Sequence, residues 1–243
     1  MTLHHGDPAA LPHPDAVIFD LDGTLVDTIP TRVRSWMEAF AAVGVVPDPG
    51  HVGRMMGCDG RRAVRELYAA AGRTASPDEM EAVDHDAGVR FARYNVAPGL
   101  LPGVGPLVRA LAAGDRVQWS IATSSRRATV AASVGALGLA RPPQVTDGTH
   151  VEHAKPAPDL LLLAARELRI PPKRCWYVGD AVWDMEAACA AGMAPVAVTT
   201  GATDTETLVR TGATVVWATM EGVHAELARR GLVAPGTETG DRR

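Results

Sequence analysis

Two aspartates at the end of a short apolar segment are the residues of this sequence best placed to do chemistry. Residues 16–19 read Ala-Val-Ile-Phe, and Asp20, Asp22 and Gly23 follow almost directly. An apolar run this short predicts a buried parallel strand, and open parallel sheets bind ligands at the carboxyl ends of their strands. Gly23 permits a tight turn that brings Asp22 back toward Asp20. Two carboxylates held so close repel each other, which indicates a divalent metal ion or a phosphoryl group in this place.

Hydroxyl side chains and a lysine follow other predicted strands. The strand expected at 117–123 ends in Thr123, and Ser124 and Ser125 come directly before a helical pattern. Backbone N–H groups and the helix dipole favour an anion there. Lys155, one of two lysines in the chain, precedes another predicted helix. Taken alone, each group has a simpler explanation as a helix cap or a solvated loop residue.

The apolar segment 175–178 repeats the pattern of the first strand. Gly179 and Asp180 follow it, and Asp184 comes one helical turn later. Carboxylates at this spacing can face one ligand, or they can cap the helix that begins here. Together, four carboxylates, a hydroxyl side chain and a lysine fall at the carboxyl ends of strands in one predicted sheet. Such a group of donors suits a hard divalent cation beside a phosphate.

Strand and helix patterns alternate around these residues. The expected elements are the strand 16–19, a helix over 104–113 that ends at Gly114, the strand 117–123, a helix from Ser125, a short strand over 144–147, a helix over 157–168, the strand 175–178, a helix from Asp180 to Gly192, the strand 194–199 and an edge strand over 213–217. Successive strand-helix units predict an α/β fold with a doubly wound parallel sheet, a Rossmann-like core.

Between residues 26 and 97 the pattern is helical only. Apolar residues recur with helical spacing, as in the segment 33–40, and residues 76–79 form a capping box that opens a further helix. Helices without a strand between them indicate an insertion into the sheet domain. Two Pro-Gly pairs in 98–103 predict a hinge at the end of this insertion.

The length of 243 residues allows one large domain with a smaller one beside it. We expect a core domain formed by residues 15–25 and 98–232, a helical cap domain over 26–97, and flexible tails at 1–14 and 233–243. All the catalytic candidates named above then belong to the core domain.

Charge and cysteine content argue against several functions. A formal net charge of −4 and a pI near 6.1 give no basic field, which disfavours nucleic acid as a partner. The three cysteines form no pairing motif, which suggests a reducing compartment. Neither a leader pattern nor an apolar run of membrane-spanning length is present, so no membrane partner is expected. We expect a cytoplasmic monomer or homodimer.

In this order, the residues resemble the four motifs of the haloacid dehalogenase superfamily. The matching positions are Asp20-Leu21-Asp22-Gly23-Thr24-Leu25, Thr123, Lys155-Pro156 and Gly179-Asp180-x-x-x-Asp184. The helical insertion after the first motif is similar to that of the capped subfamily, which includes phosphoglycolate phosphatases, other small phosphatases and β-phosphoglucomutases. The resemblance covers about residues 15–230, and the cap contributes few diagnostic positions to it.

This resemblance implies a phosphoryl-transfer mechanism. Asp20 would be the nucleophile that forms an aspartyl-phosphate, and Asp22 would protonate the leaving alcohol and later deprotonate the attacking water. Thr123 would donate a hydrogen bond to a phosphoryl oxygen, and Lys155 would neutralise the charge of the transferring group. The substrate would be a small phosphorylated metabolite.

The resemblance also implies a metal ion and a phosphate site. Mg²⁺ would be held by Asp20, the backbone carbonyl of Asp22 and Asp180, with Asp184 further out. Further phosphate-binding positions are expected next to these motifs, at Gly23, Thr24, Ser124 and Ser125.

Related activities can be compared on particular residues. Relatives that cleave phosphonates use a cap lysine, and residues 26–97 contain no lysine. Dehalogenating relatives lack the second aspartate, which is present here as Asp22. Mutases tend to carry Glu-Asp where this chain has Gly179-Asp180, so hydrolysis is favoured and a sugar phosphomutase is the alternative. A phospho-acceptor signalling module needs no cap, and a catalytically silent binding protein would not require every catalytic residue type.

Substrate choice is expected to reside in the cap. The segment 54–62 combines glycines with arginines, and its candidate binding residues are Arg54, Gly57, Arg61 and Arg62. Arginine suits carboxylate or phosphate oxygens, but a solvated turn explains the same segment equally well. The roles of Arg32 and Cys58 are left open.

Overall fold

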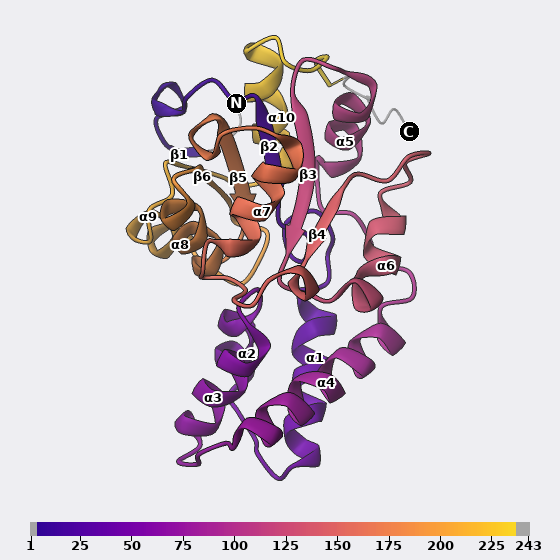
Figure 1. The fold of residues 1–243 in the computed structure, drawn as a ribbon, viewed down its shortest axis with the longest axis vertical. Helices are drawn as coiled ribbons and strands as arrows, with labels where there is room; N and C mark the ends of the chain where they lie inside the picture. The colour runs from indigo at the N-terminus through magenta and orange to yellow at the C-terminus, as the bar shows by residue number, and fades with distance from the viewer. Residues whose placement is uncertain (1–3, 237–243) are drawn as a thin grey trace, which may run out of the picture.

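The computed structural model describes residues 4–236, and within them seven strands form one sheet (Figure 1). The strands are β1 (His4–Gly6), β2 (Ala16–Phe19), β3 (Gln118–Thr123), β4 (Val145–Asp147), β5 (Cys175–Gly179), β6 (Ala194–Val198) and β7 (Val215–Trp217). Their order is β1-β7-β6-β5-β2-β3-β4, and all neighbours are parallel except β1 and β7. The predicted α/β class is confirmed, whereas the sheet is mixed because β1 runs antiparallel.

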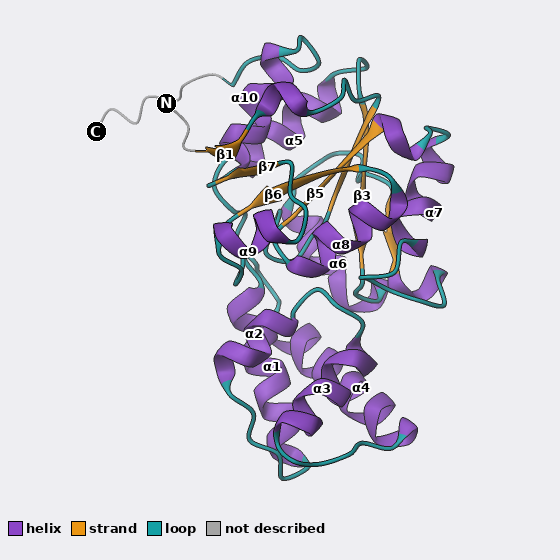
Figure 2. Cartoon of the chain, turned by 90° about the vertical axis from the view of Figure 1, so that its left-hand side faces the viewer, coloured by secondary structure: helices purple, strands orange, loops and turns teal. Residues whose placement is uncertain are grey.

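Helices cover both faces of this sheet (Figure 2). They are α5 (Val104–Ala113), α6 (Arg127–Ala136), α7 (Asp159–Leu168), α8 (Val182–Ala191), α9 (Thr205–Arg210) and α10 (Met220–Arg229), with short 3-10 helices at Pro8–Ala10, Gly148–His150 and Pro172–Arg174. As predicted from the two glycines, α5 ends at Gly114 and α8 at Gly192.

Strand β2 lies in the middle of the sheet and is buried along its whole length. Its side chains alternate between the two faces, as the period of a strand requires. Val17 and Phe19 belong to the hydrophobic core with α5 and α10, whereas Ala16 and Ile18 belong to the core with α7 and α8. Burial on both faces explains the uninterrupted apolar run and fixes the register of the residues that follow.

The prediction of a flexible tail over residues 1–14 is wrong for its described part. Residues 4–6 form β1, which pairs with β7 from His4 opposite Trp217 to Gly6 opposite Val215. The side chain of Leu11 is buried in the core. Strand β7 is therefore not an edge strand, because β1 satisfies the backbone groups that an edge would leave unpaired. Of the tail expected at 233–243, Val233 is buried, and residues 237–243 lie outside the described part of the chain.

Four helices lie beyond one end of the sheet (Figures 1 and 2). They are α1 (Ile29–Ala42), α2 (Pro49–Met55), α3 (Gly60–Ala70) and α4 (Pro77–Tyr94). The capping box of α4 is formed by Ser76 and Glu79, in agreement with the sequence. Helix α2 is unexpected, because two glycines in seven residues lower its helix propensity; the Asp48 side chain caps it by accepting a hydrogen bond from His51 N–H.

These four helices share a hydrophobic core of their own. Phe40, Leu67 and Tyr68 are buried inside it, and Trp183 at the start of α8 packs against it from the sheet domain. The indole N–H of Trp183 donates a hydrogen bond to the carbonyl oxygen of Arg54 at 3.1 Å. In residues 4–236, no helix has both the length and the hydropathy that crossing a membrane would require.

Candidate active site

The ends of three adjacent parallel strands bring the predicted catalytic groups together. Strand β2 pairs with β3 on one side and with β5 on the other. Asp20 follows β2, Thr123 ends β3, and Asp180 follows β5, so all three lie at the same edge of the sheet. This edge faces the helices α1 to α4 (Figure 2).

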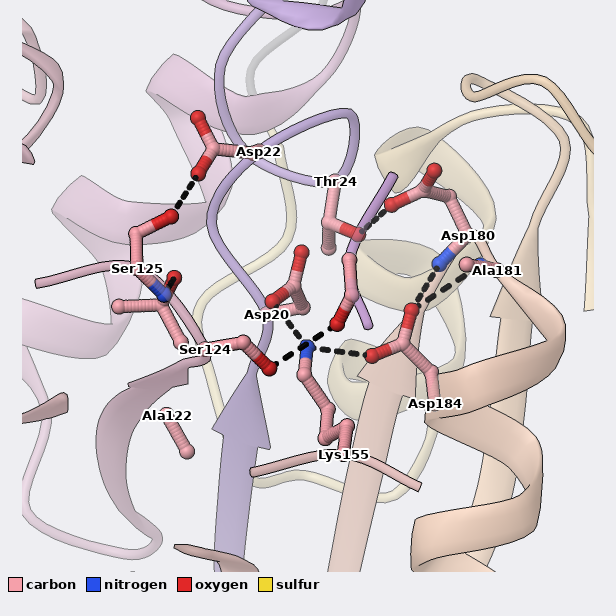
Figure 3. A network of polar contacts seen from close by, with 12 residues as sticks. Asp20, Asp22, Thr24, Ala122, Ser124, Ser125, Lys155, Asp180, Ala181 and Asp184 are labelled. Carbon is pink, nitrogen blue, oxygen red and sulfur yellow. Dashed lines mark hydrogen bonds and ion pairs between the residues drawn. The ribbon is translucent and has the colours of Figure 1, made fainter. Parts of the chain in front are cut away.

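Lys155 lies at the centre of the polar network (Figure 3). Its Nζ is 2.5 Å from Oδ1 of Asp20 and 2.7 Å from Oδ1 of Asp184, and it donates to the Tyr177 hydroxyl at 3.2 Å. The lysine side chain has no exposed surface. Burial alone would lower the pKa of Lys155, but Asp184 and Asp20 outweigh it and raise the pKa well above its usual value. A fixed positive charge therefore joins two buried carboxylates.

The two carboxylates that Lys155 joins differ in how much of their charge is compensated. Burial raises the pKa of Asp20 to about 7, and the charges of Asp184 and Asp22 act in the same direction against the opposing effect of Lys155. Asp184 also accepts hydrogen bonds at Oδ2 from the backbone N–H groups of Asp180 and Ala181, at 3.1 and 3.0 Å. Asp184 is thus held in place at both oxygens, whereas Asp20 keeps one oxygen that Lys155 does not contact.

Asp180 completes a group of three buried carboxylates with Asp20 and Asp184, whose ligand atoms all lie within 4.8 Å of one another. Burial and the two neighbouring carboxylates raise the pKa of Asp180 well above its usual value. The Thr24 hydroxyl donates a hydrogen bond to Oδ1 of Asp180 at 2.7 Å. Excess negative charge and hard oxygen donors fit a divalent cation, so this cluster could hold a metal ion.

Gly201 was not singled out in the sequence, yet it makes room for Asp180. A Cβ atom at Gly201 would lie 1.7 Å from Oδ2 of Asp180. Any side chain at this position would push the carboxylate away. The sequence carries no signal for this role, because the contact joins the loop after β6 to the end of β5.

The side chain of Asp22 points away from the three-carboxylate cluster (Figure 3). It accepts hydrogen bonds from Thr28 at 2.6 Å, from Arg32 at 2.7 Å and from Ser125 at 3.1 Å. Burial by itself would raise the pKa of Asp22, but the Arg32 charge and these hydrogen bonds outweigh it and lower the pKa. Asp22 is therefore held as a carboxylate, and the expected use of its backbone carbonyl as a metal ligand stays a prediction.

Arg32, whose role the sequence left open, links helix α1 to this carboxylate. Its guanidinium lies 3.6 Å from the centre of the Phe91 ring on α4 and donates to the Ser125 hydroxyl at 2.5 Å. Ser125 comes from the segment after β3. The arginine thus connects two helices of the insertion to two strand ends of the sheet.

Arg32→Gln is expected to lower the free energy of unfolding by roughly 2 kcal/mol at neutral pH, because hydrogen bonds to a charged group are lost. Arg32 and Asp22 are only 13% and 8% exposed, so solvent screens the pair little. The folded-state pKa of Asp22 lies below its unfolded value. Its stabilising effect is therefore present above the unfolded pKa and fades as the pH falls through the folded one. Urea unfolding at pH 7 and pH 3 should show a smaller difference between wild type and variant at pH 3; an equal difference at both would contradict the ion pair.

A cavity of about 500 Å³ lies between the sheet edge and the helical insertion. From the sheet it is lined by Asp20, Asp22, Thr123, Ser124 and Ser125, which agrees with their predicted grouping, and from the insertion by Gly57 and Arg61 among others. The Ser124 hydroxyl donates to the carbonyl oxygen of Gly57 at 2.9 Å. The nucleophile candidate thus lies in the wall of a cavity large enough for a small metabolite.

Four predicted binding residues do not line this cavity within the described residues. Arg62 stacks on the Trp183 ring and pairs with Glu66 at 2.8 Å, because one residue along α3 rotates it away from Arg61. Arg54 lies in the last turn of α2.

The other two of the four, Gly23 and Thr24, lie next to the Asp180 carboxylate. Gly23 adopts a positive φ of 83°, and a Cβ there would approach Oδ2 of Asp180 to 2.7 Å. Thr24 is fully buried with its hydroxyl on the same carboxylate. Both positions therefore support Asp180 in place of facing the cavity.

Cys58 lines the cavity as a packed side chain. It is 8% exposed, and its thiol donates to the carbonyl oxygen of Asp59 at 3.2 Å. Burial raises the pKa of this thiol well above its usual value. Since a thiolate is the reactive form, Cys58 is not set up as a nucleophile.

Comparison with known proteins gives consistent results. A model of the haloacid dehalogenase-like hydrolases matches residues 14–192. Over 183 residues the chain is 32% identical to fructose-1-phosphate phosphatase YqaB of Escherichia coli strain K12, covering 73% of this chain and 92% of the relative. It is 31% identical to phosphoglycolate phosphatase of Rhodospirillum rubrum, with 84% and 87% covered. A solved hydrolase from Pseudomonas syringae shares 29% identity at a TM-score of 0.80, with 88% of this chain and 96% of that chain covered.

Proposed function

The chain belongs to the haloacid dehalogenase-like hydrolases and is a phosphoric monoester hydrolase; we propose that it cleaves a small phosphomonoester, of sugar phosphate or phosphoglycolate type, through an aspartyl-phosphate on Asp20. The observation that carries this proposal is the position of Asp20. Its carboxylate lies in the cavity wall, beside the buried Lys155 and within a cluster suited to a metal ion.

In the first step, a carboxylate oxygen of Asp20 attacks phosphorus and the bond from phosphorus to the leaving oxygen breaks. Because Lys155 contacts Oδ1, the other oxygen of Asp20 is the attacking atom. Thr123 lines the cavity beside Asp20 and donates its hydroxyl to a phosphoryl oxygen. Lys155 and the hydrogen-bond donors offset charge on the transferring group, which supplies much of the catalysis in phosphoryl transfer.

Asp22 handles the protons of both steps. As an acid it gives a proton to the leaving alcohol, and as a base it takes one from the water that cleaves the aspartyl-phosphate. The pairing with Arg32 and Thr28 favours the basic form that the second step needs. The acid form requires that the hydrogen bonds of Arg32 and Thr28 to Asp22 loosen.

Asp20 and Asp180 would hold Mg²⁺. Asp184 would lie further from the ion, held by hydrogen bonds from Lys155 and from two backbone N–H groups. When bound, the ion supplies charge neutralisation and orients the phosphoryl group. Thr24 and Gly201 keep Asp180 in position for this. The donor set fits the ion because all three carboxylates are buried and crowded.

Residues 26–97 act as a cap over a core formed by 15–25 and 98–232 in this proposal. Hydrogen bonds that hold the cap on the core include that from the Asp59 N–H to the carbonyl oxygen of Lys155 at 3.0 Å and that from Asn95 to Ser133 at 2.8 Å. A closed cap excludes bulk water while the aspartyl-phosphate exists.

Metal removal tests the proposal directly. With Mg²⁺, the protein is expected to release phosphate from members of a panel of phosphoglycolate, sugar phosphates and nucleotides. Treatment with a strong chelator should lower the rate by about 100-fold or more, since a metal ion contributes several kcal/mol of transition-state stabilisation. Added Mg²⁺ should restore the rate.

Two results would contradict parts of this proposal. Undiminished phosphate release in the presence of a strong chelator would show that the reaction does not need a metal ion. Conversion of hexose 1-phosphates to 6-phosphates faster than phosphate appears would favour the sugar phosphomutase.

A further inference from the structure

The arginines of the cavity wall are already paired with carboxylates. Arg32 pairs with Asp22 at 2.7 Å. Arg61 and Arg126 both pair with Glu81 of helix α4, each at 2.9 Å. Within the described residues, these are the arginines that line the cavity, and there are no lysines among its lining groups. A second anionic group on a substrate would therefore have to displace an existing ion pair.

Three carboxylates of the cavity wall lie outside the predicted catalytic group. Asp59, Asp84 and Glu152 all line the cavity. The nearest cation that the structure places beside Asp84 is Arg126 at 3.6 Å, beyond hydrogen-bond distance, so Asp84 keeps acceptor capacity. A Cβ at Gly60 would lie 2.0 Å from Oδ1 of Asp84, so this carboxylate reaches the start of α3 only because position 60 is glycine. Burial also raises the pKa of Asp84, as expected for a carboxylate without a full partner.

An apolar surface completes the wall. Trp36, Met55, Met56 and Val89 line the same cavity. Sugars and polyols present C–H groups that pack on such surfaces and hydroxyl groups that donate hydrogen bonds to carboxylates. A cavity of about 500 Å³ also holds more than the smallest phosphoesters need.

We infer that the leaving group is a neutral polyol or sugar whose hydroxyl groups donate to Asp84 and Glu152, and that a carboxylate or second phosphate in this position is rejected. The inference rests on the proposed function and decides between the two substrate classes that it leaves open. Negative charge in the wall that is only partly compensated repels a second anion, whereas hydroxyl donors can satisfy its free acceptor capacity.

Matched substrate pairs test this with the full chain and Mg²⁺. Glycerol 3-phosphate and 3-phosphoglycerate differ only in a terminal CH₂OH or carboxylate, and so do glucitol 6-phosphate and 6-phosphogluconate. Both members of each pair are assayed at pH 8 under the same conditions. The neutral member of each pair is expected to have a kcat/KM at least about 10-fold higher. Equal values, or preference for the carboxylated member, would overturn the inference.

Substitutions then assign the preference to the acidic wall. Asp84→Asn is expected to reduce the ratio of kcat/KM between neutral and anionic members at least about fivefold, mainly through KM. Glu152→Gln, on an exposed residue that the fold does not depend on, should reduce it in the same direction. Asp86→Asn is the control, because Asp86 pairs with Arg90 on the same helix at 2.8 Å and is not among the described cavity residues; its rates and ratio should not change.

The outcomes separate this inference from the proposed function. If phosphate is released and the ratio is unchanged in both Asp84→Asn and Glu152→Gln, the acidic wall does not select the substrate. If neither these four substrates nor p-nitrophenyl phosphate releases phosphate, the proposed function and this inference fail together.

Discussion

Asp20→Asn is expected to lower kcat by about 10⁴-fold or more while leaving the metal-free protein at least as stable as wild type. An amide cannot attack phosphorus as a carboxylate does, and loss of a nucleophile removes the covalent route altogether. The substitution keeps the size of the side chain and an oxygen that can accept from Lys155. It also removes one of three crowded negative charges, whose repulsion the fold otherwise has to contain.

The pH dependence of stability provides the second readout of this variant. In the metal-free protein the folded-state pKa of Asp20 is about 7, raised from 3.8 by burial first and by its carboxylate neighbours. The folded state therefore binds a proton that the unfolded state has already released between these two values. Stability contributed by this group falls as the pH rises from about 4 to 7. In Asp20→Asn that decline should be smaller.

Steady-state kinetics and urea unfolding between pH 4.5 and pH 8 measure both effects on the same samples. Asp27→Asn is the matched control, since Asp27 is exposed and close in sequence. Asp27→Asn should have wild-type activity, and its stability should decline with rising pH as that of wild type does. Phosphate release by Asp20→Asn near the wild-type rate would show that Asp20 is not the nucleophile. An unfolding midpoint of Asp20→Asn well below that of wild type would contradict the repulsion between the carboxylates.

The positions at strand ends could be predicted because parallel strands impose them. Once residues 16–19 and 175–178 are recognised as buried strands, Asp20 and Asp180 must emerge at the same edge. That Asp20 and Asp180 lie close together follows from the strand order and direction alone, without knowledge of side-chain packing. The same argument places Thr123 at this edge, because it ends the strand expected at 117–123, which pairs with the first strand.

Contacts across the fold could not be predicted in this way. Strand β1 consists of His-His-Gly, which has no apolar alternation, and its pairing depends on β7 more than 200 residues later. Arg61 and Arg62 are adjacent, and only the start of α3 at Gly60 decides which of them faces the cavity. The partner of Arg32 depends on how α1 packs against the sheet, which spacing along a helix does not determine.

Lys155→Met is expected to lower the free energy of unfolding of the metal-free protein by about 3–5 kcal/mol at pH 8, because it leaves a buried carboxylate cluster without its cation. Lys155 is fully buried and contacts Asp20 and Asp184 directly, so water cannot replace its charge without rearrangement. Methionine has a similar length and fills the space, which keeps the effect of a cavity small. Activity should fall as well, since the same amine neutralises the transferring phosphoryl group.

The loss of stability should shrink at lower pH and on addition of a divalent ion. Without Lys155, Asp20 loses the interaction that lowers its pKa, so the carboxyl group takes up a proton more readily and the uncompensated charge disappears as the pH falls from 8 toward 5. Lys173→Met serves as control, because Lys173 is exposed and its replacement should change stability by less than about 0.5 kcal/mol. Urea unfolding at pH 5 and pH 8, with and without Mg²⁺, measures all of this. An equal loss under every condition would mean that Lys155 stabilises the fold by packing and not by its charge.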